Sequence, residues 1–291
     1  SVAGRRVVET AEPAVVFLQG EYGWIAPDGR PLRLVTGPDG TPRRSARGLP
    51  LTSLEGTGPP FAAQFTGSAF LVREDGLLVT NRHVARPWTA DEHAADLFAK
   101  GFRPRLRLLA YAPGANAPVG VRFVAQSRDS DLALIRAEGV ADGVRPIPLA
   151  EETPRAGDEV VVLGYPAGIG ALLARSGPAF LDSARTAHLD FWNVVEELAA
   201  AELIRPLASR GIVGQVTPAS IVYDAETTQG GSGGPVLSLS GELVAVTFGI
   251  LPEFGGSNFG VPVEEVRRLL ATVPPLPADE PAAATAGEER N

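Results

Sequence analysis

Short apolar runs alternate with turn residues along most of the chain. Glycine, proline and aspartate separate these runs, as in the turn Glu74-Asp75-Gly76. This pattern predicts many short strands joined by tight turns. In the first half, strands are expected at 14–18, 67–72, 76–80, 105–111, 119–125 and 132–135. In the second half, they are expected at 160–164, 211–217, 219–223, 235–239, 243–250 and 258–261.

A long excursion interrupts the strands of the first half over residues 22–60. It holds two Pro-Asp-Gly sequences, at 27–29 and 38–40. Proline presets φ and glycine accepts a positive φ, so each sequence favours a tight turn. We therefore expect one or two small hairpins here. A short surface helix is expected further on, at 91–100.

Helical spacing replaces the strand pattern at two places in the second half. Over 171–207 the chain is rich in Ala, Leu and Glu, and Phe191, Val194, Val195 and Leu198 recur at helical intervals, which predicts a helical insertion. A closing helix is expected over 262–272, with proline at its start and Val263, Val266, Leu269 and Leu270 on one face.

Charged and turn residues weaken the apolar signal between about 150 and 157, and the domain boundary is expected there. The predicted units are residues 1–152 and 153–273. A Pro- and Ala-rich tail at 274–291 follows and is expected to be disordered.

Composition narrows the function classes. The net charge of −8 and the scattered arginines argue against nucleic acid as a partner. The 291 residues include no cysteine, so disulfides and thiolate metal sites are excluded. No apolar run is long enough for a membrane span. The chain starts at Ser1 and lacks methionine, which indicates a processed product from which a signal peptide or anchor could have been removed.

The strongest chemical signal is the run Gly230-Gly231-Ser232-Gly233-Gly234. A nucleophilic serine needs backbone N–H groups beside it to hold an oxyanion, and glycines let the backbone bring them close. A flexible linker is the alternative, but the run lies between two apolar strands.

The run also fits the Gly-x-Ser-x-Gly elbow of α/β hydrolases, which place their histidine after the serine. All three histidines of this chain precede Ser232, so that reading fails.

The remaining order is His, Asp, Ser, and three motifs carry it. Residues 78–84 read Leu-Val-Thr-Asn-Arg-His-Val, residues 130–135 read Ser-Asp-Leu-Ala-Leu-Ile, and Tyr-Asp-Ala-Glu at 223–226 leads into the glycine-rich run. Together they resemble the motifs of trypsin-like serine peptidases, especially of the bacterial HtrA (Deg) branch. The resemblance covers most of residues 12–270.

The resemblance implies an all-β fold of two six-stranded antiparallel β-barrels of the chymotrypsin type, with the helical insertion in the second barrel and the closing helix after it. It implies a serine endopeptidase that works through an acyl-enzyme without a metal or other cofactor. The implied triad is His83, Asp131 and Ser232, and the implied oxyanion hole is formed by Gly230, Gly231 and Ser232.

Other residues compete for these roles. Asp129 is a rival to Asp131, but the family's aspartate directly precedes the Leu-Ala-Leu strand, which favours Asp131. His93 fits a surface helix, and His188 fits a structural role in the insertion. No His-Glu-x-x-His or similar spacing is present, which excludes a metallopeptidase.

The specificity pocket is expected to be lined by Glu226, Thr227, Thr228, Thr247, Phe248 and Gly249. The threonines and Phe248 favour a small or medium apolar substrate side chain. Glu226 stands where an acidic residue at the bottom of the pocket could lie, and such a residue would favour a Lys or Arg side chain of the substrate instead. Both interpretations remain open at this point.

The chain departs from the family in three respects. Gly231 precedes the nucleophile where relatives carry Asp or Asn, so an activity that depends on ordering of the oxyanion loop is expected. Members of the HtrA branch usually carry a PDZ domain after the protease, and the segment after the closing helix in this chain is too short for one. The insertion, with Phe191 and Trp192, could bind a regulatory partner or only pack on the barrel.

Two functions follow from these sequence features. The first is extracytoplasmic (periplasmic, secreted or membrane-tethered) cleavage of protein or peptide substrates, for quality control or regulated proteolysis. The alternative is a non-catalytic or conditionally active sensor or binding module.

Overall fold

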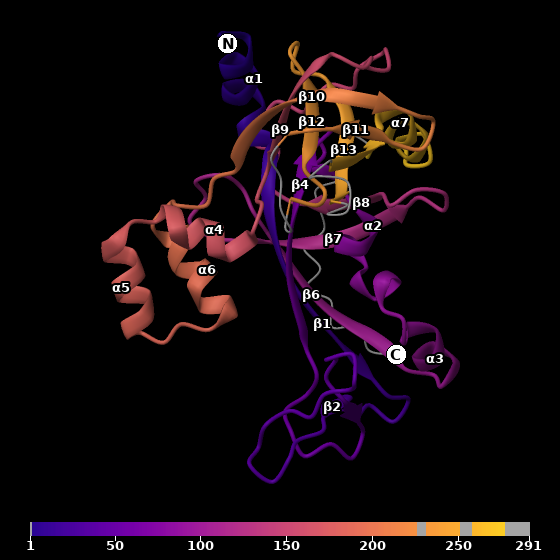
Figure 1. Cartoon of the computed structure of the whole chain (residues 1–291), viewed down its shortest axis with the longest axis vertical. Coiled ribbons are helices and arrows are strands. Elements are labelled where there is room, and N and C mark those ends of the chain that lie inside the picture. Colours follow the sequence, from indigo (N-terminus) through magenta and orange to yellow (C-terminus); the bar gives the residue numbers. More distant parts are fainter. Residues whose placement is uncertain (1, 226–230, 251–257, 277–291) are drawn as a thin grey trace.

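Two closed antiparallel β-barrels make up most of the computed structural model, which describes residues 2–225, 231–250 and 258–276 (Figure 1). The strand order is β1-β4-β5-β8-β7-β6 in the first barrel and β10-β11-β14-β13-β12-β9 in the second. The predicted fold class is therefore confirmed. The first-barrel strands are β1 (Val15–Ile25), β4 (Ala63–Leu71), β5 (Leu77–Thr80), β6 (Arg103–Tyr111), β7 (Val119–Gln126) and β8 (Ala133–Ala137). The second-barrel strands are β9 (Glu159–Gly164), β10 (Leu207–Val216), β11 (Ile221–Tyr223), β12 (Pro235–Ser238), β13 (Leu243–Ile250) and β14 (Asn258–Pro262).

The first barrel extends into an arm that the apolar pattern underestimates. Strand β1 continues to Ile25, and it pairs with β6 from Phe17 to its end. Glycine and charged residues interrupt the apolar run after residue 18, which hides this extension in the sequence. At the far end of the arm, the chain between β1 and β4 forms the small sheet of β2 (Arg33–Leu34) and β3 (Thr52–Ser53).

A separate apolar cluster holds the end of the arm together. Its buried members are Tyr22, Trp24, Ala26, Leu32, Ala94 and Phe102. Both predicted Pro-Asp-Gly turns form here, with φ of 86° at Gly29 and 78° at Gly40. Helix α3 (Ala94–Ala99) packs on the same cluster and matches the surface helix expected near it. The predicted excursion is thus an ordered lobe with its own core.

Two further helices cover the barrels. Helix α1 (Val2–Ala11) was not expected from the sequence, because its buried side is narrow and consists of Val7 and Ala11. Helix α7 (Val263–Leu270) buries Val263, Val266 and Leu269, which confirms the predicted apolar face of the closing helix. None of the described helices has the length and apolar content needed to cross a bilayer.

The insertion between β9 and β10 forms three helices, α4 (Gly168–Arg175), α5 (Pro178–Thr186) and α6 (Phe191–Ala200). Asp190 caps α6 by accepting hydrogen bonds from the N–H groups of Trp192 and Asn193. Although it follows a strand of the second barrel, the insertion contacts the first. Gln19 of β1 donates to the carbonyl of Phe191 at 2.6 Å, and the Arg107 guanidinium of β6 lies 3.8 Å from the centre of the Trp192 ring.

One apolar cluster includes residues of both barrels, and a second, smaller cluster lies within the second barrel. The rings of Phe17 and Tyr165 meet edge to face at 5.2 Å, and the buried Tyr165 hydroxyl donates to the carbonyl of Val15 at 3.0 Å. Residues 274–276 at the start of the predicted tail lie against the β4–β5 turn, where Arg73 donates to the carbonyls of Val273 and Pro274. The rest of that tail lies outside the described residues.

Candidate active site

His83 and Asp131 form a direct pair at one end of the first barrel. His83 lies in the single turn α2 (Arg82–Ala85) after β5, and Asp131 lies in the loop between β7 and β8. The Nδ1 atom of His83 is 2.5 Å from Oδ2 of Asp131, and the His83 backbone N–H donates to Oδ1 at 3.1 Å. The Asn81 side-chain amide also donates to the Asp131 carbonyl at 2.9 Å. The imidazole and the carboxylate are therefore held in a fixed mutual orientation.

The surroundings of Asp131 favour its charged form. Burial acts to raise the pKa of this carboxyl, but hydrogen bonds from the His83 ring and backbone, together with the His83 charge, outweigh burial. The pKa of Asp131 is consequently lower than its ordinary value. An ionised carboxylate can only accept a hydrogen bond, so the ring nitrogen that faces it must carry the hydrogen. The hydrogen of the neutral imidazole is therefore assigned to Nδ1. Nε2 is then the ring nitrogen that can accept a proton.

The competing residues lie elsewhere. Asp129 is exposed, and its backbone N–H donates to the Ser127 hydroxyl. His93 caps α3 on the surface, where its ring is 63% exposed beside Asp91. His188 lies exposed between α5 and α6 with a φ of 49°. Asp131, and not Asp129, contacts His83.

Ser232 is half-buried in a tight turn just before β12. The turn is fixed by the hydrogen bond from Gly234 N–H to the Gly231 carbonyl at 3.0 Å. Gly233 N–H donates to the carbonyl of Thr247 at 2.8 Å, and Thr247 N–H donates to the carbonyl of Gly234 at 2.9 Å. The second barrel thus presents Ser232 from a backbone anchored to β13.

A contact between barrels connects this turn to the histidine segment. Ser68 in β4 donates its backbone N–H to the Ser232 carbonyl at 2.9 Å, and its own carbonyl accepts the Thr80 hydroxyl at 2.8 Å. Its hydroxyl accepts from Tyr165 N–H at 3.0 Å. Ser68 and Thr80 are fully buried. Neither residue was predicted to belong to the site, although a hydroxyl residue inside each of two apolar strands is a signal visible in the sequence.

Gly233 is needed where the two barrels meet. Its φ is +88°, and a Cβ there would lie 2.1 Å from the Ser68 carbonyl oxygen and 2.4 Å from the Thr80 hydroxyl. Only glycine accepts this conformation and this close approach. Ser232 is therefore held beside the strand that leads into His83.

The predicted oxyanion hole and pocket are only partly described. Gly231 is buried, and no described residue accepts a hydrogen bond from the Ser232 N–H. Thr247 is buried with its hydroxyl bonded to Tyr223 at 2.8 Å, and Phe248 packs on Phe259 at 6.3 Å between ring centres. Gly249 continues β13 beside them. Gly230, Glu226, Thr227 and Thr228 lie outside the described residues.

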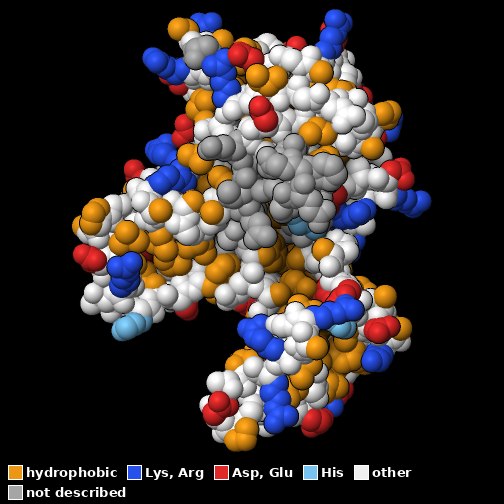
Figure 2. All heavy atoms as spheres, in the orientation of Figure 1, with side chains coloured by type: hydrophobic (Ala, Val, Ile, Leu, Met, Phe, Trp, Pro, Cys, Tyr) orange, Lys and Arg blue, Asp and Glu red, His pale blue; other side chains and the backbone are white. Residues whose placement is uncertain are grey.

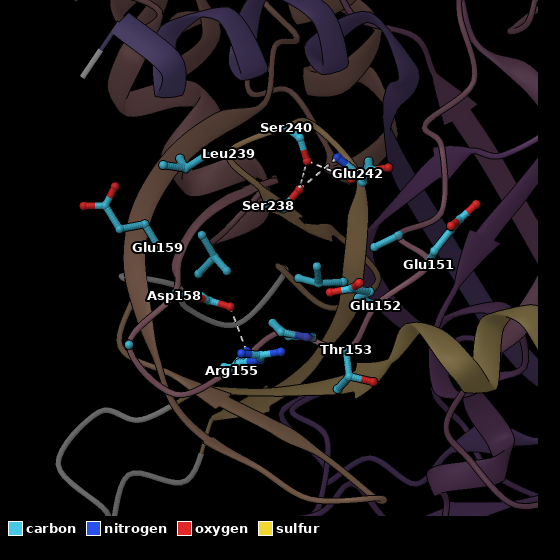
Figure 3. Close-up of a pocket in the computed structure, with 15 residues that line it drawn as sticks. Glu151, Glu152, Thr153, Arg155, Asp158, Glu159, Ser238, Leu239, Ser240 and Glu242 are labelled. Atoms are coloured by element: carbon cyan, nitrogen blue, oxygen red, sulfur yellow. Dashed lines mark hydrogen bonds between the residues drawn. The ribbon is translucent and has the colours of Figure 1, made fainter.

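A different hollow of about 600 Å³ lies at the second barrel, where Val160 and Val244 of that barrel's own apolar cluster line it. Figure 3 shows several carboxylates around it, among them Glu152, Glu159 and Glu242, and the backbone N–H of Arg155 donates to the Asp158 carboxylate. Among the predicted site residues that the structure describes, none lines it. Within the described part of the chain, no group of three His, Asp or Glu side chains could hold a metal ion.

Paired β-barrels with a histidine–aspartate pair on one and a glycine-framed serine on the other define the chymotrypsin-like class of peptidases. Residues 67–246 match the family model of the trypsin-like peptidase domain. The chain therefore belongs to the trypsin-like peptidase family.

Several HtrA-type proteases are related in sequence. Protease Do-like 1, chloroplastic, of Arabidopsis thaliana is 27% identical over 207 residues, covering 70% of this chain and 38% of that protein. A probable periplasmic serine endoprotease DegP-like of Hahella chejuensis is 27% identical over 209 residues, covering 70% and 34%. Serine protease PepD of Mycobacterium tuberculosis is 26% identical over 216 residues, covering 70% and 40%. The predicted resemblance to the HtrA branch is confirmed, and the chain spans well under half the length of these relatives.

Solved structures share the fold. The active form of the Rv3671c protease from M. tuberculosis superimposes with a TM-score of 0.54 at 19% identity, covering 93% of this chain and 85% of that one. The serine endoprotease from Yersinia pestis superimposes with a TM-score of 0.54 at 17% identity, covering 92% and 65%. At these identities the likeness concerns the fold alone.

Proposed function

We propose that this chain is a serine endopeptidase in which Ser232 is the nucleophile, His83 the general base and Asp131 the group that orients His83. The observation that carries the proposal is the 2.5 Å contact between His83 Nδ1 and Asp131 Oδ2, in a segment tied through Thr80 and Ser68 to the Ser232 turn. Family membership supports the same reaction class.

The reaction follows from these groups. Ser232 Oγ attacks the scissile carbonyl while His83 Nε2 takes its proton, and the imidazolium is stabilised by the Asp131 carboxylate. The same proton then passes from His83 to the leaving amine, so the amine departs and an acyl-enzyme remains. Water, deprotonated by His83, then attacks the ester, and His83 returns this proton to Ser232 Oγ as the acid product leaves.

The oxyanion of each tetrahedral intermediate needs fixed donors. We assign this role to the backbone N–H groups of Gly230 and Ser232, with Gly231 between them. The absence of a described acceptor for the Ser232 N–H supports this role. One such donor is worth about 3 kcal/mol of transition-state stabilisation.

The proposed substrates are unfolded or partner proteins outside the cytoplasm. The support comes from relatives whose names describe periplasmic endoproteases. The half-buried Phe248 favours an apolar side chain at the cleavage site over Lys or Arg. A peptide-library cleavage profile tests this preference, and dominant cleavage after Lys or Arg would contradict it.

A conditionally active module is the second candidate, and Gly231 is the observation that favours it. Glycine before the nucleophile leaves the oxyanion loop more backbone freedom to lose on ordering. On this view the chain hydrolyses peptides only when a substrate or partner orders that loop.

One experiment separates the two candidates. The purified chain is treated with a fluorophosphonate probe and, in parallel, with casein, next to the Ser232→Ala and His83→Ala variants. The endopeptidase proposal expects probe labelling and casein loss that both variants abolish. Fast, complete labelling without any effector contradicts the conditional module. No labelling under any condition contradicts the endopeptidase.

A further inference from the structure

A groove of about 600 Å³ lies on the arm of the first barrel, away from the triad residues. It runs along the face of β1 and β6 and is bordered by the segment that leads into β4. In Figure 1, this stretch of β1 and β6 lies between helix α6 and the lobe that carries β2. Figure 2 shows the outline of the molecule indented between these two lobes.

Gly23 lets the segment before β4 lie close against β1 at the edge of the groove. It lies between Glu21 and Ile25 on the same face of β1. A Cβ at this position would lie 2.5 Å from the carbonyl oxygen of Phe61, so only glycine allows this approach. Ile25 and Phe61 line the groove, which therefore has an apolar part.

Arginines form the β6 side of the groove. Arg105 and Arg107 both line it, and both are exposed on the same face because they are two residues apart. Neither forms an ion pair with a described carboxylate, and Arg107 is held in place by stacking on Trp192 of the insertion. Arg103 continues the row beyond the groove. Glu21 is the one carboxylate among the lining residues, and the Gln64 amide donates to it at 3.0 Å.

The spacing of the arginines indicates what they would bind. Alternate residues of a strand repeat about every 7 Å along one face. An extended peptide has the same repeat, so carboxylates at alternate positions can face successive arginines. Arginine binds carboxylates through paired hydrogen bonds. The apolar part of the groove disfavours a polyphosphate chain, which has no apolar side chains and carries a negative charge at every unit.

We propose that this groove is an exosite for an extended peptide segment with carboxylates at alternate positions, supplied by a protein substrate. The role as an exosite rests on the proposed peptidase function, whereas binding of the peptide does not. The segment would hold a substrate to the arm while another part of the same chain enters the catalytic site.

Binding is tested on the full chain carrying Ser232→Ala, so that the peptide is not cut. The probe is a fluorescein-labelled ten-residue peptide of alternating Glu and Val, followed by fluorescence anisotropy. The pair Arg105→Glu and Arg107→Glu is expected to weaken binding at least tenfold. Arg122→Glu, an exposed arginine on β7 outside the groove, is the matched control and should leave the affinity unchanged.

Three results would overturn the proposal. The first is equal affinity of the paired variant and the Arg122→Glu control. The second is equally tight binding of the same peptide with Lys in place of Glu. The third is tighter binding of oligothymidine that also depends on Arg105 and Arg107, which would assign the groove to nucleic acid. If the paired variant melts at a lower temperature than the parent, Arg105→Gln with Arg107→Gln replaces it.

Kinetics test the exosite role in the active chain. For a substrate joined to the acidic segment, Arg105→Glu alone, which leaves the stacking of Arg107 on Trp192 in place, should raise KM several-fold and leave kcat unchanged. For the same substrate without the segment, neither constant should change. If no substrate is hydrolysed, the proposed peptidase function fails while the binding result stands. If hydrolysis occurs and KM does not move, the exosite role fails alone.

Discussion

The backbone N–H of Ser68 donates to the carbonyl of Ser232 across 2.9 Å and so joins a strand of the first barrel to the turn of the nucleophile. The Ser68 carbonyl accepts the Thr80 hydroxyl, three residues before His83. The proposed base and nucleophile are thus positioned by one buried chain of hydrogen bonds that spans both barrels.

Thr80→Val tests this chain of hydrogen bonds because valine keeps the shape of threonine and removes the hydroxyl. The Ser68 carbonyl loses its side-chain donor in a buried position, and the free energy of unfolding is expected to fall by about 1–2 kcal/mol. We expect kcat to fall about tenfold with KM unchanged, since Thr80 positions the reacting groups without touching substrate. Thr80→Ser should restore kcat. A variant that loses stability but keeps kcat would show a purely structural role.

Gly233→Ala is expected to be far more damaging than the same change at Gly241. Both glycines have positive φ, +88° and +86°, so both variants pay the cost of a left-handed alanine, about 1 kcal/mol. Only at Gly233 would the new Cβ collide with buried atoms, because nothing lies within 4 Å of a Cβ at Gly241. Urea unfolding should show a loss of about 4 kcal/mol for Gly233→Ala. Similar losses in both variants would contradict the close packing of the barrels at Gly233.

Asp131→Asn tests the orientation of the imidazole. An amide can donate a hydrogen bond to Nδ1, which would move the hydrogen to Nε2 and remove the base. We expect kcat to fall about 10⁴-fold, the size of effect known for this exchange in a serine-protease triad. Asp129→Asn is the matched control and should leave kcat unchanged. Equal losses in the two variants would refute the assignment of Asp131.

Asp75 is expected to control stability in acid. It accepts hydrogen bonds from Arg73 and from the nearly buried Arg136, at 2.8 and 2.9 Å. Burial acts to raise the pKa of Asp75, but the Arg73 hydrogen bond and the charges of both arginines outweigh it and hold the pKa below its ordinary value. A carboxyl whose pKa is lower in the folded chain stabilises the fold above its unfolded pKa of about 4, and this contribution is lost as the pH falls through the folded value.

Asp75→Asn should therefore lower the free energy of unfolding by about 3 kcal/mol at pH 7, because it leaves Arg136 without its counter-charge. Urea titrations at pH 7 and at pH 3 measure the difference from the parent chain, which should shrink at the lower pH. Glu74→Gln, at the exposed neighbouring residue, is the control and should change little at either pH. A difference for Asp75→Asn that is independent of pH would contradict the charge interaction.

The fold and the candidate triad could both be predicted from the sequence because both depend on local patterns; the fold is confirmed, and of the triad the structure brings His83 and Asp131 into contact. Alternating apolar runs mark most strands, and the motifs around His83, Asp131 and Ser232 each occupy a few consecutive residues. The barrel contact at Ser68 and Thr80 depends instead on residues far apart in sequence, and nothing local indicates their pairing. Helix α1 was missed for a similar reason, since only two of its residues are buried and its stability comes from the surface it covers.

The insertion leaves the second barrel after β9 and contacts the first through Gln19 and Arg107 before it returns as β10. Because the insertion is attached to the second barrel and contacts the first, it should limit rotation of one barrel against the other. A small rotation would change the distance between the proposed base His83 and the proposed nucleophile Ser232 without breaking the strand pairing within either barrel. On heating, hydrolysis is expected to be lost at a temperature several degrees below that at which the sheets lose their circular dichroism signal. Loss of the circular dichroism signal at the lower temperature would show that the barrels unfold before the insertion detaches.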